Sequence, residues 1–183
     1  MDVGKIMCAW EFSNPKSQIK GEILVGLPYR SNFSARFVRG LLSVQYPDYF
    51  AHSVFFETGL PVDIARNVIV ANGLQRKVSH ILFLDSDVIL KNDTILQLKE
   101  SNFPIVSGVY FGRNPPYNAV ANINSVPVAR NTIIEKRNST PNTKALMEVH
   151  EIGMGCALID MRVFERIANF HKLQWYCMLR HPD

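Results

Sequence analysis

The sequence predicts a single α/β domain with a mixed, mainly parallel central sheet flanked by helices. Three observations lead to this prediction: short apolar runs of strand length, intervening segments with helical spacing, and a regular alternation of the two. The chain has 183 residues, of which 47% are hydrophobic, which is enough for one packed core. We therefore take 1–183 as one domain.

The first unit pairs a buried strand at 23–27 with a helix over 33–44. The strand stops at Pro28, and Ser31 or Asn32 can cap the helix. Apolar side chains recur through 33–44 at spacings of four, four and three residues, which is typical of one buried helix face.

Two further units follow. A strand at 53–57 precedes a helix over 62–74, with Pro61 suited to its first position and the pair Asn72-Gly73 as its stop signal. A third strand at 80–84 precedes a helix that Asn92 or Asp93 caps and that runs to about Glu100. A fourth strand is expected at 105–109.

The later part is less regular. Residues 112–144 are rich in Asn, Pro, Ser, Thr and Arg, which indicates either a binding loop or lid or a floppy insertion. Strands are expected at 147–152 and 156–159 around a Gly153-Met154-Gly155 turn, and Asp160 can cap a final helix. Residues 1–20 predict only an extension or an irregular segment.

Composition narrows the class of protein. The net charge of +4 is mild, and basic residues are dispersed, which argues against a nucleic-acid partner. No apolar run has the roughly 20 residues that span a bilayer, and the N-terminus does not resemble a signal peptide, so we expect a soluble cytoplasmic protein without a transmembrane segment. Cys8, Cys156 and Cys177 lack zinc spacing and predict reduced, partly buried thiols.

The strand at 80–84 ends in Asp85-Ser86-Asp87, two carboxylates one residue apart. Like charges beside an apolar strand are costly unless a cation compensates them. Carboxylate oxygens suit Mg²⁺ or Mn²⁺, which also accept phosphate oxygens as ligands. Ligands of open α/β sheets bind at the carboxyl ends of the strands. A DxD pair alone arises by chance, so its position makes the case; a surface turn with Asp87 or Asp93 as a helix cap is the alternative.

The chain resembles GT-A glycosyltransferases, close to the family 2-like group. The segments that carry the resemblance are HILFLDSDVIL, DIARNVIVANGL, ILVGLPYR, IVSGVYFGRNPPY and EIGMGCALIDMRVFERI, which together cover about 22–166. The resemblance implies a nucleotide-sugar-binding half at about 22–111 and an acceptor-side half at about 112–183 with a flexible loop at 112–144. The short length suggests a minimal enzyme, such as a small archaeal-virus glycosyltransferase.

The resemblance also implies site residues. Asp87 would ligate Mn²⁺ or Mg²⁺, and Asp85 would contact the ribose or a metal-bound water. Arg66 could contact the diphosphate of a UDP- or GDP-sugar, and the loop at Pro28 and Tyr29 would bind the nucleotide. Arg30 and Arg113 are further candidates for phosphate contacts. The alternative for each arginine is an ordinary solvated charge.

Transfer to a glycan or glycoprotein hydroxyl by an inverting enzyme also needs a general base. Glu151, beside the Gly153-Met154-Gly155 turn, is the candidate, with Glu148 and His150 as rivals and an exposed strand residue as the alternative. Relatives often carry an acidic pair after the aromatic position that Trp175-Tyr176 matches, whereas this sequence continues only to Asp183.

Two other functions stay open. A haloacid-dehalogenase-type phosphatase also has an apolar strand followed by DxD, with the first aspartate as nucleophile. Against it, two strand–helix units precede the motif, and no acidic pair follows Asp93. A non-catalytic nucleotide- or glycan-binding domain would keep the motif without turnover. A dinucleotide-binding GxGxxG and a P-loop are absent from the sequence.

Overall fold

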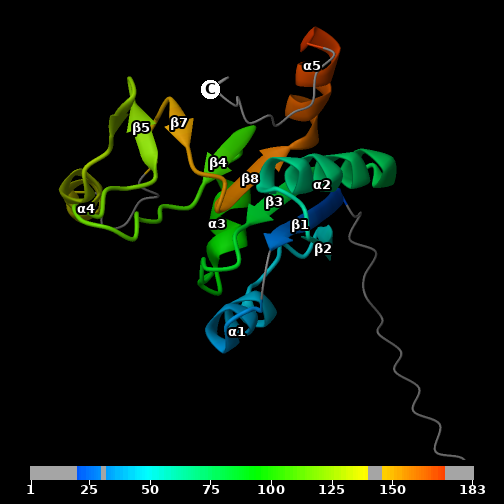
Figure 1. Cartoon of the computed structure of the whole chain (residues 1–183), viewed down its shortest axis with the longest axis horizontal. Helices are drawn as coiled ribbons and strands as arrows, with labels where there is room; N and C mark the ends of the chain where they lie inside the picture. Colours follow the sequence, from blue (N-terminus) through cyan, green and yellow to red (C-terminus); the bar gives the residue numbers. More distant parts are fainter. Residues whose placement is uncertain (1–19, 30–31, 140–145, 172–183) are drawn as a thin grey trace, which may run out of the picture.

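A computed structural model describes residues 20–29, 32–139 and 146–171, and this part of the chain forms a mixed α/β fold with five helices and two sheets (Figure 1). A five-stranded sheet of order β2-β1-β3-β8-β4 forms the centre, and a three-stranded sheet of order β6-β5-β7 stands to one side with α4. The elements in chain order are β1 (Gly21–Tyr29), α1 (Ala35–Ser43), β2 (Phe50–Thr58), α2 (Val62–Arg76), β3 (His80–Leu84), α3 (Thr94–Glu100), β4 (Ile105–Ser107), β5 (Ala121–Ile123), β6 (Val126–Pro127), α4 (Arg130–Ser139), β7 (Glu151–Ile152), β8 (Cys156–Asp160) and α5 (Met161–His171).

The central sheet is mixed, as the sequence predicts. Strands β1, β2 and β3 run parallel, while β8 is antiparallel to both of its neighbours, β3 and β4. The four residues from Ile81 to Leu84 are fully buried, because helices cover both faces of the sheet. Burial on both faces explains why this strand is a continuous apolar run and not an alternating one.

Two hydrophobic cores lie on the two faces of the central sheet. One joins strand residues to Phe37 of α1 and Ile95 of α3, and the other joins them to Ile69 of α2 and Phe164 of α5. Successive strand side chains point to opposite faces, so each central strand contributes to both cores. Within the described residues, every helix is too short or too polar to cross a lipid bilayer.

The first helix is capped differently from the prediction. It begins at Ala35, and the hydroxyl of Ser34 accepts a hydrogen bond from the Phe37 amide at 3.1 Å. The predicted cap at Ser31 or Asn32 is wrong, because Phe33 stays in the connection and its ring stacks on Phe37 at 4.9 Å between centroids.

The later helix starts lie at the predicted positions. Helix α3 begins directly after Asp93, although the Asp93 side chain accepts no capping hydrogen bond from the backbone. At the start of α5, Asp160 Oδ1 accepts a hydrogen bond from the Arg162 amide at 2.9 Å.

The predicted stop of α2 is wrong. The helix passes through Asn72-Gly73 and ends at Arg76, where Lys77 takes a left-handed conformation with φ of 56°. Gly73 is buried against β3, and a Cβ there would lie 3.0 Å from Ile81 Cδ1. The glycine therefore serves close helix–sheet packing rather than helix termination.

The segment between β4 and β8, residues 108–155, differs most from the prediction, and we call it the excursion. The predicted loop at 112–144 contains β5, β6 and α4, and the left-handed residues Asn124 and Ser125 make the turn between the two strands. The strand expected at 147–152 is reduced to β7, which pairs with β5. The strand expected at 105–109 ends early at Ser107.

Cys156 is a buried free thiol in β8, as predicted. Burial raises its pKa to about 11, so it stays protonated and inert at neutral pH. Cys8 and Cys177 lie outside the described residues.

Candidate functional site

The Asp85-Ser86-Asp87 motif lies where β3 leaves the central sheet. Because β1, β2 and β3 are parallel, their carboxyl ends meet at one edge. Gly26 pairs with Phe83 and Tyr29 pairs with Thr58, so the connections that follow the three strands start side by side. This edge is where open α/β sheets bind their ligands.

Backbone hydrogen bonds fix the motif. The Asp85 amide donates to the Gly155 carbonyl at 3.0 Å, which ties the motif to the turn before β8. The Val88 amide donates to the Asp85 carbonyl at 3.0 Å and closes a turn over the motif. The side chains of Asp85 and Asp87 remain 35% and 46% exposed, so both carboxylates are accessible to a ligand.

Arg66, one of the residues expected to contact phosphate, lies against Asp85. It lies on the first turns of α2, which starts from the same sheet edge, and its Nη2 donates to Asp85 Oδ1 at 3.2 Å. Its side chain is only 15% exposed, and within the described residues its buried Nε has no hydrogen-bond partner. A buried donor without a partner is unusual and marks a place where a polar ligand would be favoured.

Arg113 contacts the other carboxylate. Its guanidinium pairs with Asp87, and its side chain is 80% exposed. Exposed ion pairs contribute little, about 0–1 kcal/mol, so the pair costs little to separate. Arg113 comes from the excursion after β4, so the two halves of the chain meet at Asp87.

A hollow of about 400 Å³ opens beside the two carboxylates. Its polar side is formed by Asp85, Asp87 and Arg113, and its apolar side by 88–89, 109–111 and Val120. The central sheet supplies the acids, and the excursion supplies much of the opposite wall. Two carboxylates and a cavity therefore coincide at the end of β3.

Tyr110 shapes the wall of the hollow, and the sequence did not single it out. Its hydroxyl accepts a hydrogen bond from the Gly155 amide at 2.9 Å. A side chain at Gly155 would crowd both neighbours, because a Cβ there would lie 3.0 Å from Tyr110 Oη and from Asp85 Oδ2. Burial raises the pKa of Tyr110, so its hydroxyl is neutral near pH 7. The sequence signal for this contact was the Gly153-Met154-Gly155 segment, since glycines allow another group to approach the backbone closely.

The predicted nucleotide loop lies at the same sheet edge. Pro28 is buried at the end of β1, and Tyr29 is partly buried. The Tyr29 ring lies 4.5 Å from that of Phe33 and 6.3 Å from that of Phe56, between centroids. Arg30 lies outside the described residues. Phe33 and Phe56 were not foreseen as part of this aromatic group.

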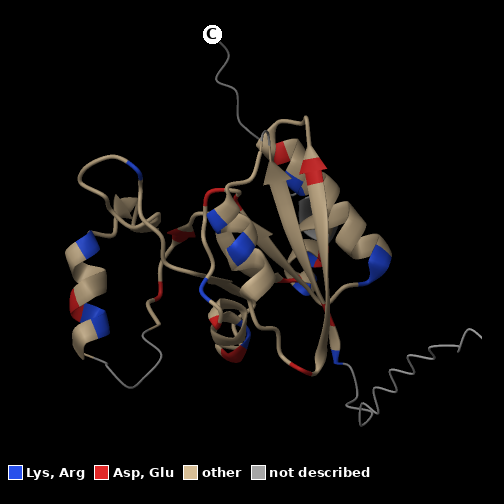
Figure 2. Cartoon of the chain, turned by 90° about the horizontal axis from the view of Figure 1, so that it is seen from below, with Lys and Arg blue, Asp and Glu red and all other residues tan. Residues whose placement is uncertain are grey.

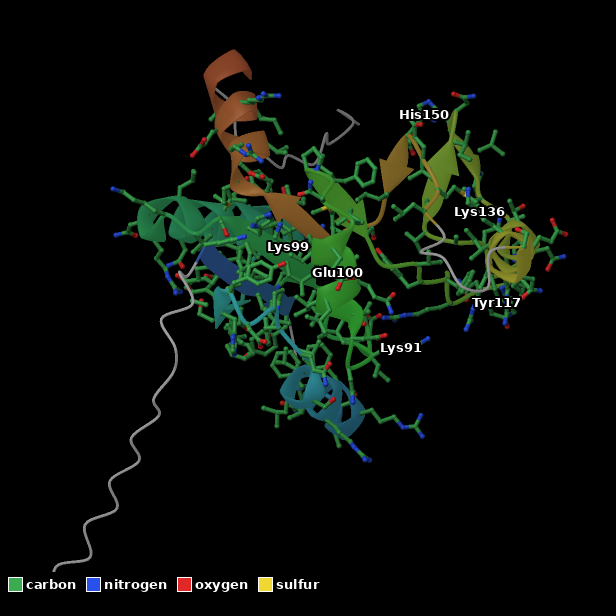
Figure 3. All side chains as sticks on the ribbon, turned by 180° about the vertical axis from the view of Figure 1, so that it is seen from behind. Lys91, Lys99, Glu100, Tyr117, Lys136 and His150 are labelled. Atoms are coloured by element: carbon green, nitrogen blue, oxygen red, sulfur yellow. The ribbon has the colours of Figure 1, made fainter. Side chains whose placement is uncertain are left out.

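Glu151 is exposed on β7 and does not belong to the lining of the hollow. Its Oε2 accepts a hydrogen bond from Asn122 Nδ2 across the β5–β7 pair. The rival His150 directly precedes β7 and lies away from α3 (Figure 3). The structure therefore brings together Arg66, Asp85, Asp87 and Arg113, while Glu151 lies on β7 of the three-stranded sheet and its role as the base stays a prediction.

The residues present are compatible with a divalent cation. No group of three or more His, Cys, Asp or Glu side chains suited to a metal occurs in the described ranges. Mg²⁺ is, however, commonly held by one or two carboxylates, with water and substrate phosphates completing its ligands. Asp85 and Asp87 supply two accessible carboxylates, so they fit a metal that binds together with a phosphorylated ligand.

Comparisons with known proteins add information on the fold alone. No family model matches the sequence, and no curated protein matches it. Among solved structures, the crystal structure of A197 from STIV is similar, with a TM-score of 0.53 and 13% sequence identity. The similarity covers 80% of this chain and 68% of that chain. It supports the mixed α/β architecture, and the function has to be argued from the site.

Proposed function

We propose that this chain is a GT-A-type glycosyltransferase that moves a sugar from a UDP- or GDP-sugar to a hydroxyl of a glycan or glycoprotein. One observation carries the proposal. The carboxylates of Asp85 and Asp87 leave the carboxyl edge of parallel strands beside a hollow of about 400 Å³, and an arginine contacts each of them. Paired acids and guanidiniums at one such edge suit a ligand that carries both phosphate and a bound cation.

Asp85 and Asp87 would hold Mn²⁺ or Mg²⁺ together with the diphosphate. When bound, the metal would supply Lewis-acid neutralisation of the leaving diphosphate. Arg66 is positioned to add a charge-assisted hydrogen bond, because its buried Nε lacks a partner among the described residues. Arg113 can leave Asp87 and bind a phosphate oxygen with little loss of free energy, since its side chain is 80% exposed.

The remaining residues at the sheet edge would orient the donor. Tyr29 ends β1 next to the motif, and its ring belongs to an aromatic group that can flank a nucleotide base. Tyr110 holds the turn at Gly155 against Asp85 and so fixes the wall of the hollow. Both are positioning residues in this proposal.

In this proposal, residues of the excursion form the side of the site that binds the acceptor. A base has to take the proton of the acceptor hydroxyl as the new bond forms. Glu151 is our candidate, because β7 ends close to the hollow. Just after β7, the Gly153 amide donates a hydrogen bond to the carbonyl of Val120, which lines the hollow. The alternative phosphatase shares the apolar strand and the DxD pair, but the further acid that it needs beside Asp85 and Asp87 has no counterpart in the described residues.

Calorimetry with UDP- and GDP-sugars, with and without Mn²⁺, tests the donor site. We expect metal-dependent binding and slow hydrolysis of one donor, and loss of the metal-dependent binding in Asp87→Asn. Asp48→Asn is the matched control, because Asp48 is an exposed aspartate before β2, at the opposite edge of the sheet. Full metal-dependent binding by Asp87→Asn would move the metal site elsewhere.

The same protein sample separates the alternatives. Metal-dependent binding without hydrolysis or transfer, over a panel of acceptors, would favour a non-catalytic binding domain. Release of phosphate from a simple phosphomonoester, lost in Asp85→Asn, would favour the phosphatase. Absence of both donor binding and turnover would refute the transferase.

A further inference from the structure

The outward face of α1 combines apolar and basic side chains. Leu42 is 81% exposed and Val38 is 40% exposed, so two aliphatic side chains one helical turn apart face solvent. Arg36 and Arg39 are exposed on the same helix. Arg39, Val38 and Leu42 also line a shallow open depression there.

The loop beside α1 extends this face. Ile89 is 53% exposed, and its Cγ2 would lie 3.4 Å from a Cβ placed on Gly40 of α1. Lys91 extends outward from the same loop (Figure 3). The loop is fixed to the helix end, because the Gln45 amide donates to the Asn92 carbonyl at 2.7 Å.

We call the set of exposed side chains on the helix and this loop the α1 surface. Its members are Arg36, Val38, Arg39, Leu42, Ile89 and Lys91.

Every charged side chain of helix α1 is basic, whereas the adjoining loop carries Asp87 and Asp93 as well as Lys91. Residues 32–46 contain no Asp or Glu, and α1 shows basic but no acidic segments when seen from below (Figure 2). None of the side chains of Arg36, Arg39 and Lys91 forms an ion pair within the described residues. Three basic side chains surround exposed aliphatic side chains. This combination is complementary to a partner with an anionic surface and an apolar interior.

We propose that the α1 surface binds the face of an anionic lipid bilayer. Leu42 and Val38 would reach below the headgroups, while Arg36, Arg39 and Lys91 would stay at the phosphate level. Two or three separated aliphatic tips bury too little area for a stable protein interface, which needs about 1,000 Å² or more. The same tips suffice for reversible bilayer binding when basic residues assist them.

This inference does not rest on the proposed transferase, because the α1 residues that carry it lie outside the lining of the hollow. The two regions are nevertheless neighbours, since Ile89 belongs to the α1 surface and also lines the hollow. A protein docked through α1 would hold the candidate site close to the bilayer. An acceptor presented at a membrane would then be within reach of Asp85 and Asp87.

Sedimentation of the full chain with vesicles tests the proposal. We expect binding to phosphatidylcholine vesicles that contain phosphatidylglycerol, and little binding to phosphatidylcholine alone. The double variant Arg39→Glu with Leu42→Ser should lower the partition coefficient roughly tenfold or more, from the loss of one charge contact and one inserted side chain. The matched control is Arg137→Glu with Val126→Ser, which changes an exposed basic residue of α4 and an exposed aliphatic residue of β6.

Each outcome bears on the proposal. Failure of the wild type to sediment with anionic vesicles overturns it and leaves an acidic protein as the partner that the charges would fit. Equal losses in the test and control variants also overturn it, as does equal binding to neutral vesicles. If the double variant fails to fold by circular dichroism, Arg36→Glu with Arg39→Glu keeps both aliphatic side chains and should show the same loss. Donor calorimetry on these variants should be unchanged, which separates this result from the transferase.

Discussion

Gly153→Ala tests how the wall of the hollow is built. A methyl group at Gly153 would collide with the Tyr110 hydroxyl and lie 2.6 Å from Val120 Cγ1, far inside normal carbon contact. Both neighbours line the hollow, so the added atom must push its wall outward. Overpacking of this kind costs about 1–3 kcal/mol, and loss of the Tyr110–Gly155 hydrogen bond adds about 1 kcal/mol. We therefore expect a destabilisation of about 2–4 kcal/mol.

Urea and thermal unfolding measure this loss. For a domain of this size, each kcal/mol lowers Tm by about 2–4 °C, so the expected drop is roughly 4–16 °C. Gly112→Ala is the matched control in the same excursion, because the nearest atom to its Cβ would be the Asn118 carbonyl oxygen at 3.7 Å. It should change the free energy of unfolding by less than about 1 kcal/mol.

A double variant adds a sharper criterion. Tyr110→Phe removes the hydroxyl that the new methyl group would meet, so Gly153→Ala should cost less in that background than in the wild type. Equal effects of Gly153→Ala and Gly112→Ala, or strict additivity with Tyr110→Phe, would refute the packing of Tyr110 on this turn. The affinity for a nucleotide ligand should fall in Gly153→Ala and not in Gly112→Ala, because only the former displaces Tyr110 and Val120 in the wall of the hollow.

The other predictions concern catalysis, donor binding and pH. Glu151→Gln should lower sugar transfer by about two to four orders of magnitude with donor binding unchanged, whereas Glu148→Gln should not; an unchanged rate would remove Glu151 from the role of base. Arg66→Gln should weaken binding of a nucleoside diphosphate roughly ten- to a hundredfold by calorimetry, and unchanged affinity would make Arg66 purely structural. Burial, assisted by Lys99, lowers the pKa of His80 from 6.5 to about 4. The unfolded chain therefore binds this proton more readily, so stability should decline as pH falls from 6.5 toward 4, and His80→Gln should flatten that part of a Tm–pH profile.

Secondary structure is predicted most accurately from the sequence where a strand is buried on both faces of the sheet. Strand β3 matches the predicted 80–84 because its apolar run is bounded by a polar motif on one side and a helix end on the other. The placement of Arg66 beside Asp85 also follows from alternation of strand and helix, since parallel strands send their connections to the same edge. Both features depend on local patterns that a single sequence displays.

The missed features depend on contacts between distant segments. Gly73 looks like a helix stop, yet it is retained inside α2 because Ile81 packs on it from β3. The small sheet was read as a loop because β5, β6 and β7 are only two or three residues long, and β7 finds its partner some 30 residues away. Tyr110 acquires its position through a hydrogen bond to Gly155, across a sequence separation of 45 residues. None of these contacts leaves a periodic signal in the sequence.

The chain leaves the central sheet after β4 and re-enters it at β8 at adjacent points, so the excursion can be regarded as a separate module. The Gly108 amide donates to the Cys156 carbonyl at 2.9 Å, so the chain departs after β4 and returns at β8 at neighbouring points. Everything between them is an insert with adjacent ends, and a short turn could join β4 to β8 as a simple hairpin. Recombination or engineering could therefore exchange this insert as a cassette while the strands that present Asp85 and Asp87 keep their register. The acids and the wall that faces them would then vary independently.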